Sequence, residues 1–418
     1  MTNDDANRRQ LGAEIAHWRH AVGALADIDA LSSTVAWAGL EEYLRTGLRA
    51  RLRSVVAGLE LEGTQLQTAF NADGGTGELR ARLLRLRDRY VQAETVLDFF
   101  GDAVATRADP AAAALLRGLD TIAGDSIEAV LRPLGIETPP VLVYFDKGLG
   151  ASILRAGVRL WDRANPSPAA AIKMTRHNAG HPTALLHETG HQVAHLTGWN
   201  QELAAALASR LRGRSTELAD AWESWASEVG ADVYAFAHCG WAPLPALANV
   251  VDGPSESVFR LMLGDPHPFP WVRVMFNVAL CRSWYGPGPW DGLGQAWWAR
   301  HPAAAAPGLA GRVARASVEA MQEIVDVCTR TPMKAFGGRP LTALVDPLRA
   351  SPRELDALAE RAGGTLLTSS YLMRRESIRI LAWLVTRTPL EPRLANEHRA
   401  RLRQWLSAMG TQALARTA

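Results

Sequence analysis

The five residues from 187 to 191 read His-Glu-Thr-Gly-His, and they constrain the fold more tightly than any other stretch of the chain. Residues four apart in an α-helix share a face, so a helix here would present His187 and His191 to a single Zn²⁺. Glu188 would then point at the water that the metal holds. We therefore expect this segment to lie on a helix, next to further metal ligands.

The flanking residues predict where that helix begins and ends. His181-Pro182-Thr183 places a proline where a helix can start, and apolar residues at helical spacing follow on both sides of the motif. Gly198 is a plausible end. Gly190 costs roughly 1 kcal/mol relative to alanine inside a helix. It is either a tolerated glycine or a point where another backbone or side chain comes close to the metal.

A catalytic zinc usually takes three side chains, so one ligand is missing. A histidine ten residues after the first would indicate the metzincin pattern, but that position holds Thr197. His195 lies one turn further along the helix, and we expect it to be buried or solvated rather than a ligand. The stronger candidate is Glu228, in a predicted second helix over residues 222–236. Asp232 shares its face and could fix the orientation of a ligating imidazole.

His-Glu-x-x-His followed by Glu-x-x-x-Asp resembles the gluzincin metallopeptidases. The form of the second motif, residues 228–232, looks closest to the branch that contains the CAAX prenyl endopeptidases and the heat-shock membrane zinc proteases. The resemblance spans roughly residues 170 to 275. It implies zinc held by His187, His191 and Glu228, with Glu188 as the catalytic base. Asp232 would accept a hydrogen bond from a ligating histidine and orient its ring.

Residues 267–273, His-Pro-Phe-Pro-Trp-Val-Arg, resemble a third motif of that branch. The two prolines would fix an extended loop. The resemblance implies that His267 and Arg273 lie near the scissile carbonyl or the bound peptide, and His267 is the leading candidate for stabilising the oxyanion, ahead of Tyr234 and Tyr285. The alternative is a proline-rich loop with a solvated histidine.

Two short segments upstream of the motif have the character of strands. Residues 141–145 are apolar throughout, and residues 171–177 alternate apolar and polar side chains. By resemblance, Ile172 to His177 would be the sheet edge that binds an extended peptide. It could equally be an internal strand.

Composition sets the limits of the prediction. The chain of 418 residues is 48% hydrophobic and 21% charged, which is typical of a globular protein. Its three cysteines form no C-x-x-C pair, and no secretory leader is visible, so we expect a cytoplasmic location. The longest apolar stretches fall short of the ~20 residues of a membrane span. A membrane substrate is therefore not carried over from the resemblance.

The flanks are predicted to be helical. We expect a helical bundle or hairpin over residues 1–135, a zincin-like catalytic domain over 136–300 and a C-terminal helical region over 301–418, with one small sheet beside the active-site helix. The arginines of the first region are more typical of a solvated helix face than of a nucleic-acid contact. The aromatic segment 283–290 is either a wall of the cleft or a packed turn.

The sequence thus predicts a mainly α protein with a small β-sheet, acting as a zinc-dependent peptidase, in particular an endopeptidase, on peptide or protein substrates. One alternative is a zinc-containing scaffold that binds partners. Another is a latent protease that a regulatory partner activates through the helical flanks.

Overall fold

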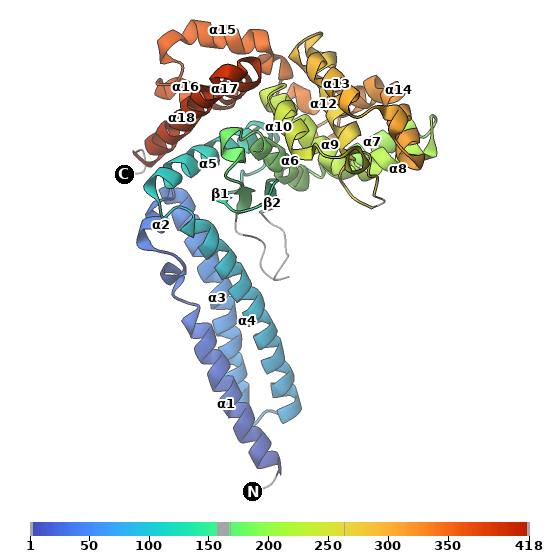
Figure 1. Ribbon diagram of the computed structural model, residues 1–418. Helices are drawn as coiled ribbons and strands as arrows, with labels where there is room; N and C mark the ends of the chain where they lie inside the picture. The colour runs from blue at the N-terminus through green and yellow to red at the C-terminus, as the bar shows by residue number, and fades with distance from the viewer. Residues whose placement is uncertain (1–2, 157–166, 168, 263, 416–418) are drawn as a thin grey trace.

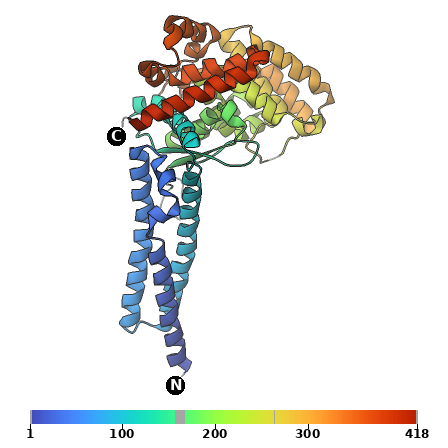
Figure 2. The same ribbon diagram turned by 60° about the vertical axis from the view of Figure 1, so that its left-hand side comes forward.

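The computed structural model describes residues 3–156, 167, 169–262 and 264–415. Over these residues the protein is mainly α-helical with one three-stranded sheet, as the sequence predicts. Figures 1 and 2 show a long helical arm that projects from a compact helical body, with the N-terminus at the far end of the arm. The sheet lies where the arm meets the body.

Three long helices, α1, α3 and α4, form the arm. They lie side by side in both views, and the short helix α2 is near the arm's base (Figures 1 and 2). The far part of the arm has its own apolar core, which includes Ile15, Leu59 and Leu83. The bounds are α1 (Asn3–Ala24), α2 (Thr34–Ala38), α3 (Glu42–Asn71) and α4 (Thr76–Ala105).

The sheet has the strand order β1-β3-β2. Strand β1 (Val141–Phe145) runs parallel to β3 (Ala170–Met174), and β2 (Ser152–Leu154) runs antiparallel to β3, with Ile153 opposite Ile172. The prediction that residues 172–177 form a sheet edge is therefore wrong. The strand ends at Met174 and is the central one, because the three-residue β2 pairs along its other side.

The two faces of the sheet belong to different cores. Leu142 and Ala171 point toward the base of the arm and pack with Phe100 of α4. Val143 and Ile172 belong to the core of the body, into which α5 (Pro110–Leu131) also packs. Successive strand residues face opposite ways, so five apolar residues in β1 serve two cores at once.

Helix α6 (Ala184–Thr197) carries the His-Glu-x-x-His motif, and it ends at Gly198, whose φ of 75° lies in the left-handed region. Pro182 precedes the helix by two residues instead of opening it. The predicted helix over 222–236 is interrupted: α8 (Thr216–Ser224) ends at Trp225, and α9 (Ala226–Cys239) starts there. Helix α7 (Trp199–Leu211) connects α6 to this pair.

The rest of the body is helical, and α18 runs along α5 in Figures 1 and 2. No helix within the described ranges is long and apolar enough to cross a membrane. The bounds are α10 (Pro243–Val251), α11 (Ser255–Val258), α12 (Pro270–Tyr285), α13 (Pro289–Arg300), α14 (Gly308–Arg330), α15 (Pro352–Ala362), α16 (Ser370–Arg375), α17 (Ser377–Leu390) and α18 (Ala395–Ala415).

Candidate metal centre

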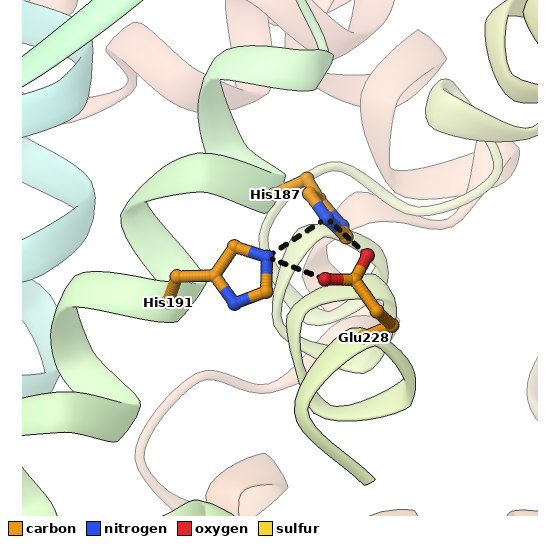
Figure 3. A group of neighbouring side chains, drawn as sticks. All are labelled: His187, His191 and Glu228. Carbon is orange, nitrogen blue, oxygen red and sulfur yellow. Dashed lines mark hydrogen bonds and ion pairs between the residues drawn. The ribbon is translucent and has the colours of Figure 1, made fainter. Parts of the chain in front are cut away.

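Helices α6 and α9 bring three potential metal ligands together. His187 and His191 are one turn apart on α6, and Glu228 projects from the first turn of α9 (Figure 3). The Glu228 carboxylate lies 3.3 Å from Nε2 of His187 and 3.2 Å from Nε2 of His191, and the two Nε2 atoms are 3.2 Å apart. One donor atom from each residue falls within a span of 4.8 Å, so this group could hold a metal ion.

The chemistry of these donors fits a cation. Nδ1 of His187 is 2.8 Å from Oδ1 of Asp232, so this nitrogen carries the proton and donates it to the carboxylate. In the neutral ring, Nε2 of His187 then has a lone pair and faces the oxygens of Glu228, which also only accept. Converging lone pairs repel each other unless a cation or a proton lies between them.

A buried ion pair holds Asp232 in place. Arg273 lies in the first turn of α12, and its Nε and Nη2 each donate to Asp232 over 2.8 Å. Asn277, one turn further along α12, donates to the same carboxylate over 3.1 Å. Burial by itself would raise the pKa of Asp232, but Arg273 and His187 hold it well below its usual range.

Arg273 also contacts the ligand Glu228, with Nη2 at 3.3 Å from Oε2. Burial would raise the pKa of Glu228, whereas the hydrogen bonds from His187 and His191, together with the charge of Arg273, keep it far below the ordinary value. Pro270 begins α12, so Arg273 is on a helix and not in the extended loop that the prolines predict. Its guanidinium is turned toward the two carboxylates.

Glu188 lies beside this group without a partner of its own. It is 7% exposed and lines the same cavity, and its carboxylate makes no hydrogen bond or ion pair with any residue in the described ranges. Burial raises its pKa, and the charges of His187 and His191 oppose that shift. A carboxylate that is buried, free and next to metal ligands is suited to accept a proton from water.

His267 stands at the mouth of the site. Its side chain is 57% exposed, and its Nε2 lies 3.6 Å from Oε2 of Glu228. The other ring nitrogen, Nδ1, is 2.7 Å from Oδ1 of Asp265, and the same carboxylate accepts the backbone N–H of His267. Asp265 thus orients the ring with Nε2 toward the cavity.

Three polar residues at the site, Ser227, Asn200 and Asn277, were not predicted from the sequence. Ser227 precedes the ligand Glu228, and its hydroxyl lies 3.4 Å from Nδ1 of His191, while Asn200 of α7 donates to that hydroxyl over 3.2 Å. The spacing of Asn277, four residues after Arg273 on one helix, was a usable signal. Asn200 gave none, because its place beside the site depends on how α7 packs against α9.

The three donors open onto a cavity of about 500 Å³. Residues of β2, the start of α6, α9, α10 and the segment 266–273 line it. Tyr234 and Tyr285 do not, since their hydroxyls donate to the carbonyls of Ser126 and Pro347. His195 is not part of the ligand group either. No residue of the aromatic segment 283–290 lines this cavity, so the packed turn is the better description of it.

Comparisons with models of protein families, with curated proteins and with solved structures give no significant match for this chain. The function proposed for this chain therefore depends on the geometry of the site and on the motifs.

Proposed function

We propose that the protein is a zinc-dependent peptidase of gluzincin type, and specifically an endopeptidase. The observation that carries the proposal is the free, buried carboxylate of Glu188 beside three converging donors that open onto a cavity. Two imidazoles and one carboxylate with an open side are the donor set of catalytic zinc sites, whereas structural sites usually close all four positions.

Each residue then has a distinct task. His187, His191 and Glu228 hold the ion, and Asp232 keeps His187 in the tautomer whose Nε2 is free to bind it. Bound zinc supplies a more acidic water and polarises the scissile carbonyl. Glu188 takes the proton of the attacking water and passes it to the leaving amine.

His267 and Arg273 have different tasks in this proposal. His267 is the group that stabilises the negative charge on the carbonyl oxygen, because its Nε2 faces the cavity beside Glu228. Arg273 acts as a positioning residue, because Asp232 and Glu228 already occupy its guanidinium.

The free edge of β2 is the proposed seat for substrate backbone. Among the described strands β2 pairs only with β3, and its residues Ser152 and Ile153 line the cavity. An extended peptide that adds to such an edge gains main-chain hydrogen bonds. This arrangement supports a peptide substrate over a small molecule.

A scaffold protein that retains zinc without hydrolysis is the competing function. It would have no need of an unpaired carboxylate at the position of Glu188, since burying an unpartnered carboxylate costs free energy. A regulatory partner remains a prediction, as does latency.

The proton-transfer role of Glu188 can be tested with one isosteric change. Glu188→Gln should retain about one zinc per chain, because Glu188 is not a ligand, and should lose hydrolysis of an unfolded protein substrate by roughly a thousandfold or more. Metal analysis and a fluorogenic casein assay measure both quantities. Glu360→Gln, an exposed site on α15, is the matched control. Normal hydrolysis by Glu188→Gln would refute the mechanism.

The ligand assignment predicts a definite order of metal affinities. Glu228→Ala removes a donor and should raise the zinc dissociation constant at least a hundredfold, whereas His195→Ala, one turn beyond His191 and outside the ligand group, should leave it nearly unchanged. Competition with a chromophoric chelator gives both constants. The reverse order would show that the wrong third ligand has been assigned.

A further inference from the structure

Strand β2 and the residue after it present two kinds of side chain to the metal cavity. Ser152, Ile153 and Arg155 line it, whereas Leu154 does not and packs against the core at the base of the arm. From Ile153 to Arg155 the chain follows the alternation of an extended strand, in which every second side chain shares a face. The cavity side therefore changes from an aliphatic group at Ile153 to a cation at Arg155, about 7 Å further along.

Within the part of the chain that the structure describes, Arg155 has no partner for its charge. It is half-buried, and its guanidinium makes no ion pair or hydrogen bond with any residue in the described ranges. The other arginine that lines the cavity, Arg273, is bound by Asp232 and Glu228. A half-buried guanidinium without a counter-charge has lost part of its hydration, so a carboxylate that arrives there is favoured.

The charge of Arg155 also acts on α6. Burial lowers the pKa of His195, and the positive charge of Arg155 lowers it further. His195 lies one turn beyond the ligand His191, so Arg155 is on the side of the cavity toward the C-terminal end of α6. The three carboxylates that line the cavity, Glu188, Glu228 and Asp232, all belong to the metal centre.

Helix α10 supplies an aliphatic wall of the same cavity. Its sequence, Pro-Leu-Pro-Ala-Leu-Ala-Asn-Val-Val, has a single polar residue, yet only Leu244 is buried. Leu247, Val250 and Val251 line the cavity, and Val250 is 38% exposed. Apolar surface left uncovered next to a metal centre is typical of a place where a ligand's apolar side chain binds.

We propose that the cavity selects peptides that carry a carboxylate two positions along the extended chain from an aliphatic residue. The aliphatic side chain packs on Ile153, Leu247 and Val250, and the carboxylate forms a bidentate pair with Arg155. The spacing follows because a peptide added to β2 has the same repeat as the strand. This inference rests on the proposed peptidase function. The carboxylate is either an Asp or Glu side chain or the C-terminal carboxylate of the peptide.

Matched peptides test the inference and distinguish the two sources. Each peptide contains one leucine. In the first set, the residue two positions before or after the leucine is either Glu or Gln. In the second set, the peptide ends two positions after the leucine, either as a free carboxylic acid or as an amide. Wild-type protein should show kcat/KM roughly tenfold or more higher for the acid of a pair. A difference within the Glu and Gln pairs identifies a side chain, and a difference within the acid and amide pair identifies the C-terminus.

Charge reversal identifies Arg155 as the residue responsible. Arg155→Glu should abolish the preference for acid and favour the corresponding Lys peptide, while Arg155→Gln should only abolish the preference. Arg401→Glu, an exposed arginine of α18 that is not part of the cavity lining, makes the same change in net charge and should leave the preference intact. Zinc content and the melting temperature confirm that each variant is folded.

Binding to the Glu188→Gln variant, measured by fluorescence anisotropy, separates this inference from the proposed function. Equal affinity and equal cleavage of acid and amide peptides, unchanged in Arg155→Glu, would overturn the role of Arg155 and leave the peptidase proposal standing. Acid-dependent binding without cleavage by wild-type protein would overturn the peptidase proposal and support the subsite.

Discussion

At the scale of single residues, the charges around His187 decide what occupies the site. Burial alone would lower the pKa of His187, but hydrogen bonds to Asp232 and Glu228 raise it to about 10 when no metal is bound. A proton on Nε2 then takes the place that a metal would have. Metal and proton therefore compete for the same lone pair, and ligand sets of this kind bind metal with release of protons.

His238 is a buried group outside the metal centre, and it makes stability depend on pH. It is 5% exposed, and burial lowers its pKa to about 3 from 6.5. The folded protein keeps the ring neutral while the unfolded chain takes up a proton below pH 6.5. The contribution of His238 to the unfolding free energy is complete above pH 6.5. It is lost at up to about 1.4 kcal/mol per pH unit as the pH falls toward 3.

His238→Phe should remove this dependence. Between pH 6.5 and 4.5 the wild-type protein should lose roughly 2 kcal/mol more unfolding free energy than the variant. Urea unfolding in the presence of EDTA, at several pH values, measures the difference without the metal. The exposed His20→Phe on α1 should behave as wild type. Parallel pH profiles of wild type and His238→Phe would contradict the prediction.

At the scale of elements, the distance between α6 and α9 sets the geometry of the ligands. Gly190 faces α9, and a Cβ atom there would lie 3.0 Å from Cβ of Tyr234 and 3.1 Å from Cα of Ala231. Both atoms belong to a buried helix, so they have little room to move. Gly190 is thus the point of closest approach between the helix that carries two ligands and the helix that carries the third.

Gly190→Ala should weaken metal binding although alanine favours the helix. The gain of about 1 kcal/mol in helix propensity is offset by the clash, which pushes Glu228 away from the imidazoles. We expect the zinc dissociation constant to rise roughly tenfold or more. Gly124→Ala on α5 is the control, because nothing lies within 4 Å of its added Cβ. Unchanged zinc affinity in Gly190→Ala would show that the two helices adapt.

Much of this arrangement was predictable from local patterns. The helix that ends at Gly198, the strand over 141–145 and the face shared by Glu228 and Asp232 follow from spacing within one element. The hydrogen bonds from Arg273 to Asp232 could not be predicted in this way, because the sequence does not show which carboxylate a guanidinium will bind. Strand β2 was missed for a physical reason: with three residues it has no readable period, and only its pairing with β3 makes it a strand.

At the scale of the whole molecule, the arm has two parts with different consequences for the site. Its far part encloses a core built from α1, α3 and α4. Its base shares a core with the sheet, where Phe100 packs with Leu142 and Ala171. Residues 175–183, which include a short 3₁₀ helix at Asn178–Gly180, connect β3 to α6. The base of the arm therefore supports the sheet from which the chain passes into the ligand helix.

Alanine substitutions in the two parts of the arm should therefore affect zinc release differently. Leu83→Ala, in the far core, should lower the unfolding free energy of the arm by about 2–5 kcal/mol. It should leave the zinc affinity and the denaturant midpoint of zinc release unchanged. Phe100→Ala, fully buried under the sheet, should cost about 3–5 kcal/mol and shift zinc release to lower denaturant. Release can be followed with a zinc-sensitive dye, and unfolding of the arm by hydrogen exchange of the backbone amides of α1, α3 and α4. If Leu83→Ala moved zinc release as far as Phe100→Ala does, the arm and body would unfold as one cooperative unit.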